Sequence, residues 1–530
     1  MTSTAVPAPA DTTSDTPREV VVGTGPVTPE QLVAVARHGV GVRLDEGALA
    51  ALAHGRDVVE RLASQDRPVY GVSTGFGALA TRHIPVADRA RLQRSLVRSH
   101  AAGSGPEVET EVVRGLMLLR LSTLATGRTG VRPETAGLLA DLLTHRITPV
   151  VREYGSLGCS GDLAPLSHVA LALLGEGEVR DAAGTLLPAA DALAAAGLAP
   201  VELGAKEGLA LINGTDGMLG MLLMAAADLR LLLDTADVAA AMSIEGLLGS
   251  DRVFGEAIAA LRPHPGQLTS SAHLRALLAD SGIVASHRGP DCTRVQDAYS
   301  LRCTPQVHGA ARDTLAHAEA VAGRELASTV DNPVLVGDDV ESNGSFHGAP
   351  VGYVLDFLAI AVADVASISE RRTDRFLDAA RNHGLPPFLA HDPGVDSGLM
   401  IAQYTAAGIV SELKRLAVPA SVDSIPSSAM QEDHVSMGWA AARKLRRAVD
   451  GLTRVLAVEV LTAARGVELR SPLVPAPASA AVVSLLHAHG VAGPGPDRFT
   501  SPDIETVVGL VGSGAVVAAA RAALPDGALA

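Results

Sequence analysis

The chain has 530 residues, of which 47% are hydrophobic and 19% are charged, a composition typical of a globular protein with a sizeable core. Its formal net charge of −15 is not relieved by any basic stripe, which argues against nucleic acid as the main partner. The three cysteines, at positions 159, 292 and 303, form no C-x-x-C pair and no metal-ligand spacing. They favour a reducing compartment over a disulfide framework, and no metal is expected.

Residues 1–19 are rich in Thr, Pro and Ser and have neither a basic start nor an apolar core, so they predict a disordered tail and no signal peptide. The longest late uncharged run, residues 506–520, is Gly-rich and shorter than the roughly 20 apolar residues that a bilayer requires. We therefore expect a soluble, cytoplasmic protein.

The first elements predict a smaller mixed α/β domain over residues 20–130. A short strand and turn at 19–25 precede a helix over 28–39, with Thr28 as N-cap, a glutamate near the capping-box position and a closing glycine. A second amphipathic helix follows over 45–65, and then a Gly-rich segment over 70–80.

Beyond residue 130 the pattern becomes strongly helical. Broadly apolar helices need one another to bury their faces, so a long-helix bundle is expected within a helical body over 131–470. The last residues, 471–530, predict a Pro-rich linker and a small C-terminal segment. The long helices are expected over residues 213–249, 305–328, 350–381, 397–417 and 433–469.

Several polar and aromatic residues stand in turn-like segments, and loops on a rigid scaffold often carry function. Aromatic residues make up only 2% of the chain, yet Tyr70 and Tyr299 lie beside Gly, Ser or Asp. Each of these residues also has a purely structural explanation, which for either tyrosine is the packing of a loop onto the core. The corresponding explanations are a helix cap for Asn213, a surface ion pair for Arg302, a core position for His100 and a helix-dipole charge pair for Glu432 with Asp433.

Common catalytic motifs fail on this chain. The segment "GVSTGFG" lacks the Lys-Ser/Thr of a phosphate-binding loop, and "EDHVSMG" has no partner histidine at metal spacing. The string "GCSGD" departs from the hydrolase elbow G-x-S-x-G at Asp162. The tight loop over 154–168, with Cys159-Ser160-Gly161 at its centre, needs another explanation.

Eight separated motifs, in one order from about residue 20 to 470, resemble the aromatic amino acid ammonia-lyase family, whose enzymes depend on a 4-methylidene-imidazol-5-one group (MIO). The resemblance implies a mainly α fold, with a long-helix bundle of the ammonia-lyase/fumarase-like type and a smaller mixed N-terminal domain. The motifs are "YGVSTGFG", "SHAAG", "GSLGCSGDLAPLSH", "KEGLALINGT", "VQDAYSLRC", "VDNP", "FHGAP" and "QEDHVSMG".

The resemblance implies that the loop closes on itself to form MIO. The nitrogen of Gly161 would attack the carbonyl carbon of Cys159, and two waters would leave, one of them with the hydroxyl of Ser160. Glycine leaves room for the bent approach of its nitrogen, and serine has a β-hydroxyl to lose. Position 159 contributes only its carbonyl, so Cys is tolerated where Ala is usual, and its thiol is expected to be a bystander.

The resemblance also implies roles around the ring. Tyr70 would take the β-proton of the substrate, and Arg302 would hold the substrate carboxylate with its planar fork of donors. Asn213 would lie at the ring and the same carboxylate. Three further residues would converge on the substrate or pack beside the ring: Gln296 and Tyr299, on one helical face with Arg302, and Phe346.

Substrate choice is expected to depend on His100 and Glu432, because a carboxylate accepts an imidazole N–H that a phenyl ring does not have. His100 alone also fits a tyrosine enzyme, whereas the pair favours L-histidine and the product trans-urocanate, in histidine breakdown. Whether the amine or the imidazole of the substrate would add to the ring stays open. Two departures from the family pattern are Ser345, where Asn is usual, and Met430, where many relatives have Asn.

The resemblance further implies a homotetramer whose sites are shared between chains. The rival hypotheses are a tyrosine or phenylalanine ammonia-lyase, a 2,3-aminomutase, a fumarase-like elimination enzyme, and a non-catalytic helical assembly protein.

Overall fold

A computed structural model describes residues 19–65, 68–75, 82–289, 292 and 295–529, so most of the tail expected over 1–19 lies outside the described residues. The chain forms two compact units, each assembled from segments far apart in the sequence. Unit 1 comprises Met1–Gly220, Leu326–His347 and Ile425–His434. Unit 2 comprises Met221–Glu325, Gly348–Ser424 and Val435–Ala530.

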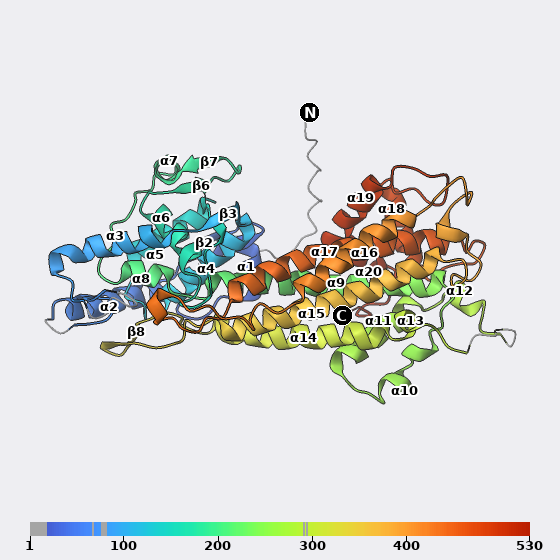
Figure 1. The fold of residues 1–530 in the computed structure, drawn as a ribbon, viewed down its shortest axis with the longest axis horizontal. Coiled ribbons are helices and arrows are strands. Elements are labelled where there is room, and N and C mark those ends of the chain that lie inside the picture. Colours follow the sequence, from blue (N-terminus) through green and yellow to red (C-terminus); the bar gives the residue numbers. More distant parts are fainter. Residues whose placement is uncertain (1–18, 66–67, 76–81, 290–291, 293–294, 530) are drawn as a thin grey trace. The chain divides into compact units, whose positions relative to one another are not determined.

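Unit 1 combines short helices with small sheets (Figure 1). In its described residues the sheets are the parallel pair β1–β2, the antiparallel pair β3–β5, the three strands β4–β6–β7 and the hairpin β8–β9. Its elements are β1 (Glu19–Val22), α1 (Pro29–Ala36), β2 (Gly41–Leu44), α2 (Glu46–Ala63), the 3-10 helix η2 (Val86–Asp88), α3 (Arg89–His100), β3 (Ser104–Glu107), α4 (Thr110–Ala125), α5 (Pro133–Thr144), β4 (Thr148–Pro149), β5 (Arg152–Tyr154), α6 (Leu163–Leu173), β6 (Glu178–Arg180), β7 (Leu186–Pro188), α7 (Ala189–Ala195), α8 (Glu207–Ile212), β8 (Val334–Val336), β9 (Asp339–Glu341) and the 3-10 helix η5 (Ser428–Met430).

The start of α1 confirms the predicted cap and corrects its partner. The Thr28 hydroxyl accepts a hydrogen bond from the Gln31 N–H at 3.2 Å, and the Gln31 side chain accepts one from the Thr28 N–H at 2.9 Å. The capping box is therefore closed by Gln31, whereas Glu30 lies in the first turn, where its charge complements the helix dipole.

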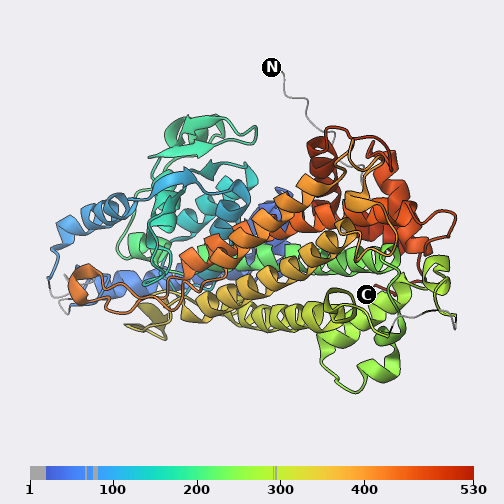
Figure 2. The same ribbon diagram turned by 45° about the vertical axis from the view of Figure 1, so that its right-hand side comes forward.

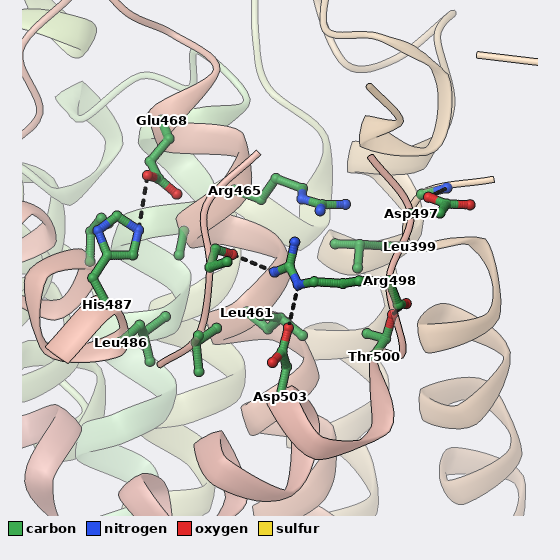
Figure 3. A pocket seen from close by; sticks show the side chains of 15 residues that line it. Leu399, Leu461, Arg465, Glu468, Leu486, His487, Asp497, Arg498, Thr500 and Asp503 are labelled. Atoms are coloured by element: carbon green, nitrogen blue, oxygen red, sulfur yellow. Dashed lines mark hydrogen bonds and ion pairs between the residues drawn. The ribbon is translucent and has the colours of Figure 1, made fainter. Parts of the chain in front are cut away.

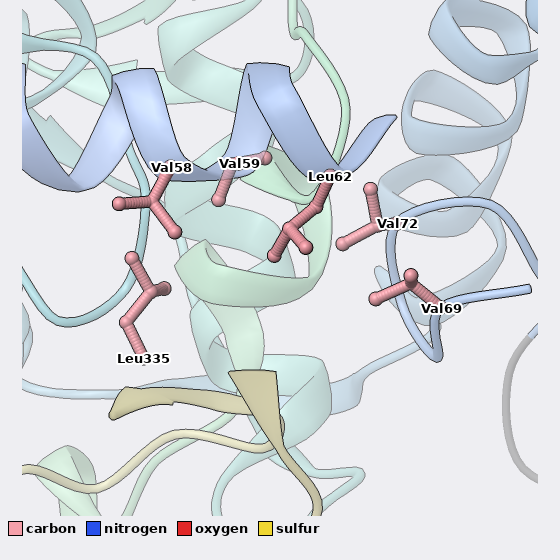
Figure 4. Close-up of a cluster of buried hydrophobic side chains, with 6 residues drawn as sticks. All are labelled: Val58, Val59, Leu62, Val69, Val72 and Leu335. Atoms are coloured by element: carbon pink, nitrogen blue, oxygen red, sulfur yellow. The ribbon is translucent and has the colours of Figure 1, made fainter. Parts of the chain in front are cut away.

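A buried cluster anchors the segment that contains Tyr70 (Figure 4). Val69 and Val72 flank the turn at Tyr70 and are 4% and 0% exposed. They pack with Leu335 of β8 and with side chains of α2, and the Val69 N–H donates to the Ser73 hydroxyl at 2.9 Å. The residues just after this turn, 76–81, lie outside the described part.

Unit 2 is almost entirely helical (Figure 2). It contains α9 (Asp216–Gly246), whose first residues belong to unit 1, the 3-10 helix η3 (Arg252–Phe254), α10 (Glu256–Ala259), α11 (Pro265–Leu277), α12 (Gly282–Ala285), α13 (Tyr299–Arg302), α14 (Thr304–Leu326), α15 (Ala349–Leu377), the 3-10 helix η4 (Pro387–Leu389), α16 (Met400–Leu416), α17 (Gly438–Glu468), α18 (Pro477–Ala488), α19 (Ser501–Gly512) and α20 (Ala515–Ala522).

The long helices α9, α14, α15 and α17 run side by side (Figures 1 and 2) and are linked by buried and part-buried polar contacts. Glu459 of α17 accepts from Ser243 of α9 at 2.7 Å and pairs with Arg372 of α15 at 2.5 Å. Arg312 of α14 donates to Asp234 and to Asp237 of α9, both at 2.8 Å. The predicted fold class, mainly α with a long-helix bundle, is confirmed.

Polar contacts between side chains lie at the end of the bundle, near the C-terminal helices (Figure 3). His487 of α18 contacts Glu468 of α17 at 3.1 Å, and Arg498 pairs with Asp503 of α19 at 2.9 Å. The first contact links α18 to α17, whereas the second lies within the segment that begins α19, and all four residues line a small cavity.

Two helical stretches of the described residues, Glu207–Gly246 and Ala349–Leu377, are long and apolar enough to cross a membrane by length and composition. Within their most apolar windows, 100% and 67% of the residues are buried inside the protein. Their apolar surface is thus largely used for packing within the molecule.

Candidate active site

The loop with Cys159, Ser160 and Gly161 lies in unit 1 between β5 and α6, and contact with a second turn fixes its shape. Gly161 has φ of +75°, and a Cβ there would lie 2.1 Å from the carbonyl oxygen of Gly214. Asp162 donates its N–H to the same oxygen at 2.7 Å. Only glycine fits position 161. Its backbone nitrogen therefore lies in a tight turn with no side chain on the same residue to obstruct it.

Asp162 fastens this loop to the start of α9. Its side chain is fully buried, and its two oxygens accept from the Ser156 hydroxyl at 2.8 Å and the Met218 N–H at 2.9 Å. Burial raises the pKa of this carboxyl to about 7, against the lowering effect of those donors.

Asn213, the residue after α8, contacts the loop through its side chain. Its Nδ2 donates to the carbonyl oxygen of Ser160 at 3.2 Å. The side-chain amide nitrogen therefore binds the loop and does not cap a helix. Its Oδ1 is buried and has no hydrogen-bond partner among the described residues. The main-chain oxygen of Asn213 accepts from Arg120 at 2.8 Å, which holds the residue in place from behind.

Glu432 lies against the same loop, although it is 272 residues from Ser160 in the chain. Its Oε1 is 3.2 Å from the Ser160 hydroxyl, and its Oε2 is 3.2 Å from the Cys159 thiol. Because α17 begins at Gly438, the explanation of Glu432 as part of a charge pair in a first helical turn is wrong. Burial and the Glu432 charge raise the pKa of the Cys159 thiol to about 12, so the thiol keeps its proton at neutral pH.

His100 ends α3 and lies within the electrostatic reach of Glu432. Burial lowers the pKa of its imidazole, against the raising effects of the Leu96 carbonyl and of Glu432. The ring is therefore neutral at pH 7. Its Nδ1 lies 2.9 Å from the Leu96 carbonyl oxygen, which can only accept, so Nδ1 carries the hydrogen and Nε2 is left as an acceptor.

Tyr70 and Phe346 are half-buried residues of unit 1. Phe346 follows a short loop that Asn343 braces, since the Asn343 amide donates to the Asp331 carbonyl at 3.0 Å and accepts from the Ser345 N–H at 2.8 Å. Ser345, which departs from the family pattern, is thus held through its backbone, and its loop keeps a defined support.

The remaining predicted residues, Gln296, Tyr299 and Arg302, belong to unit 2. Because α13 begins at Tyr299, Gln296 lies before the helix, and the expectation of one helical face for all three residues is wrong for Gln296. The Arg302 guanidinium lies over the Tyr299 ring, 4.7 Å from its centre. Gln296 and Arg302 line a cavity of about 520 Å³, and Arg302 forms no ion pair with any described residue.

Two residues near the loop, Ser427 and Asp162, are not predicted from the sequence to belong to the site. The Ser427 hydroxyl donates to Glu432 Oε2 at 3.0 Å. A serine five residues before a glutamate does not by itself indicate such a contact. In the sequence, Asp162 is noted only because it does not match the hydrolase motif G-x-S-x-G. In the structure its buried side chain anchors the loop.

Comparison with known proteins points to one enzyme family. The model of the aromatic amino acid lyase family matches residues 27–488. The histidine ammonia-lyase of Streptomyces coelicolor is 65% identical over 503 residues, which cover 95% of this chain and 98% of that protein. Two solved structures are also similar: the tyrosine aminomutase of Streptomyces globisporus, with a TM-score of 0.90, 38% identity and coverage of 96% of this chain and 99% of that chain, and the histidine ammonia-lyase of Trypanosoma cruzi, with a TM-score of 0.88, 36% identity and coverage of 96% of each chain. The chain belongs to the aromatic amino acid lyase family, as the motifs of its sequence predict.

Proposed function

We propose that this protein is a histidine ammonia-lyase, which eliminates ammonia from L-histidine without oxidation to give trans-urocanate. The observation that carries the proposal is the placement of the Glu432 carboxylate, 3.2 Å from the Ser160 hydroxyl and near the neutral imidazole of His100. An acidic acceptor beside the reacting loop suits a substrate whose ring has an N–H. The 65% identity to a histidine ammonia-lyase supports the same assignment.

The residues of the loop fit the MIO group. Gly161 sits where no side chain is tolerated, Ser160 has a hydroxyl to lose, and Asn213 donates to the Ser160 carbonyl oxygen, which the ring would retain. Formed from Cys159, Ser160 and Gly161, the group supplies an electrophilic carbon that acts as the electron sink no ordinary side chain provides. The unpaired Oδ1 of Asn213 leaves one buried acceptor beside this position.

The chain's own residues would then bind the substrate and move its proton. Tyr70, on the turn anchored by Val69 and Val72, takes the β-proton. Arg302, which has no carboxylate partner among the described residues, holds the substrate carboxylate. Tyr299 and Gln296 contact the substrate, and Phe346 packs beside the loop.

The discrimination between substrates follows from hydrogen bonding. Glu432 accepts the imidazole N–H of histidine, and the Nε2 of His100 offers a second acceptor nearby. A phenyl ring leaves the Glu432 charge unpaired in a partly desolvated site, which costs binding energy. A phenol has a single O–H, so it can donate to the Nε2 of His100 or to Glu432 but not fully to both.

We propose a homotetramer in the cytoplasm, with sites shared between chains. The proposal follows from the resemblance of the motifs to the aromatic amino acid lyase family. Size-exclusion chromatography with light scattering tests this: a monomer that is fully active would contradict it.

The substrate assignment is tested by incubating the purified protein separately with L-histidine, L-tyrosine and L-phenylalanine. We expect urocanate absorbance from histidine and little conversion of the other two. Coumarate, cinnamate or a β-amino acid as the main product would reassign the protein to a tyrosine or phenylalanine lyase or to an aminomutase. An intact Ser160 together with no activity on any of the three would indicate a non-catalytic assembly protein.

A further inference from the structure

We infer that Ser427 and Cys159 are positioning residues that hold one oxygen of Glu432, so that the other oxygen is presented to the substrate's imidazole. This inference rests on the proposed function and adds to it a means of setting substrate specificity. Three donors surround the Glu432 carboxylate: the Ser427 hydroxyl at 3.0 Å and the Cys159 thiol at 3.2 Å on Oε2, and the Ser160 hydroxyl at 3.2 Å on Oε1.

The backbone holds Ser427 and Glu432 opposite each other. The Ser427 N–H donates to the Glu432 carbonyl oxygen at 2.8 Å, and the Glu432 N–H donates to the Ser427 carbonyl oxygen at 3.3 Å. The turn between them, Ser428–Met430, has positive φ at all three residues, which closes the loop tightly. The backbone therefore holds the Ser427 hydroxyl next to the Glu432 carboxylate.

Cys159 supplies the second anchor from the reacting loop itself. Its side chain is only 8% exposed, and its thiol keeps a proton that it can donate. A thiol is a weak donor, so its contribution is smaller than that of the serine hydroxyl. The usual Ala at this position would leave Oε2 with Ser427 alone.

Ring formation changes only one side of this arrangement. The Ser160 hydroxyl departs as water, so Oε1 loses its donor, whereas the Ser427 hydroxyl and the Cys159 thiol, the two donors on Oε2, are both retained. The step that creates the electrophile thus also frees the carboxylate oxygen that receives the imidazole N–H. A carboxylate already held at one oxygen loses less rotamer freedom when the substrate binds.

The test compares Ser427→Ala, Cys159→Ala and Cys159→Ser with the wild-type protein, and Ser428→Ala is the matched control because its hydroxyl makes no hydrogen bond to Glu432. Ring content is measured by the mass of the loop peptide and should be complete in all of them. We expect the KM for histidine to rise about tenfold in Ser427→Ala, as for the loss of a hydrogen bond to a charged group, with kcat changed much less. Cys159→Ala should raise KM by a smaller factor, and Cys159→Ser should restore it.

A double-mutant cycle separates positioning from general damage. In a Glu432→Ala background, Ser427→Ala should cause less than about a twofold further change, because its effect acts through the missing carboxylate. An active wild type with an unchanged KM in Ser427→Ala, or a loss of activity that follows a loss of ring content, overturns this inference alone. A wild type inactive on histidine overturns the proposed function and this inference with it.

Discussion

At the scale of single residues, each member of the loop Cys159-Ser160-Gly161 contributes a different feature. Gly161 contributes the absence of a side chain, since a Cβ would meet the Gly214 carbonyl oxygen at 2.1 Å. Ser160 contributes a hydroxyl that faces Glu432. Cys159 is expected from the resemblance to be a bystander, but its thiol contacts Glu432 Oε2, and this contact gives it a part in the site.

Replacement of Ser160 by alanine should abolish turnover of histidine without unfolding the protein. The change removes the hydroxyl whose loss is needed for the ring, and we expect kcat to fall by about 10³-fold or more. Because the wild-type protein has already lost this hydroxyl in forming the ring, no hydrogen bond from it to Glu432 is lost, and stability should change by no more than about 1 kcal/mol. Steady-state kinetics and thermal unfolding check the two parts; wild-type turnover in this variant would refute the ring.

Replacement of Glu432 by glutamine should act selectively on histidine. The amide keeps the shape but loses the charge that strengthens a hydrogen bond to the imidazole N–H, so kcat/KM for histidine should fall by about 10- to 100-fold. Any weak turnover of tyrosine or phenylalanine should not fall with it. A substrate panel measures the ratio, and an equal loss on every substrate would mean that Glu432 supports the loop instead of choosing the substrate.

At the scale of elements, a strained turn and a buried charge cluster decide how well the two units hold their shape. The turn is η5, in which Met430 has φ of +71° and a side chain that is 67% exposed. The cluster joins α9, α11 and α14, where Asp237 accepts from His308 at 2.7 Å and from His273 at 3.0 Å and pairs with Arg312 at 2.8 Å.

Met430→Asn should stabilise unit 1 slightly. Asparagine tolerates the left-handed region better than methionine, and the exposed methionine side chain loses little packing when it is replaced. We expect a gain of up to about 1 kcal/mol with no change in KM for histidine, measured by thermal unfolding and kinetics. A clear loss of stability would show that this turn does not have the conformation described.

Asp237→Asn should destabilise the bundle by about 3 kcal/mol, because it removes the buried anion that two buried histidines share with the part-buried Arg312 and leaves Arg312 with Asp234 alone. Denaturant unfolding at neutral pH measures the loss. A matched change of the exposed Asp338, which pairs with Arg61 on the surface, should cost less than about 1 kcal/mol. Equal effects of the two changes would contradict the proposed importance of the buried cluster.

The same cluster predicts that stability falls on acidification. Burial lowers the pKa of His308, so the unfolded chain takes up this proton first, and stability is lost as the pH drops from about 6.5 towards the folded pKa. Burial opposes the lowered pKa of Asp237, but hydrogen bonds from His273 and His308 and the charge of Arg312 hold it well below its usual range. The stability that Asp237 provides is therefore lost only below about pH 4. A His308→Gln variant should flatten the upper part of the profile, and an unchanged slope between pH 7 and 5 would contradict this assignment.

At the scale of the whole molecule, the long helices were predictable and the tertiary contacts of the site were not. The helices expected over 305–328 and 350–381 are α14 (Thr304–Leu326) and α15 (Ala349–Leu377), because an apolar period sustained over many turns is a strong local signal. The small sheets of unit 1 have strands of two to four residues, too short for such a signal. The domain borders at 130 and 470 stay a prediction.

The contacts within the candidate site could not be predicted from local sequence patterns either. Its motifs reveal which residue types are present, and the resemblance supplies their roles. The contact between Cys159 and Glu432 joins residues 273 positions apart, and no local pattern encodes such a meeting. The anchoring by Ser427 and Asp162 likewise depends on tertiary packing, so only the structure reveals it.

The chemistry of the loop and the choice of substrate can be measured together in one sample. The mass of the loop peptide from the purified wild-type protein is measured by mass spectrometry, and the same preparation is incubated with L-histidine. We predict a mass lower by two waters and the appearance of urocanate absorbance. An unmodified Cys159-Ser160-Gly161 peptide in a sample that still produced urocanate would show that the reaction does not need the ring. A modified peptide in a sample inactive on histidine but active on tyrosine or phenylalanine would contradict the assignment of the substrate.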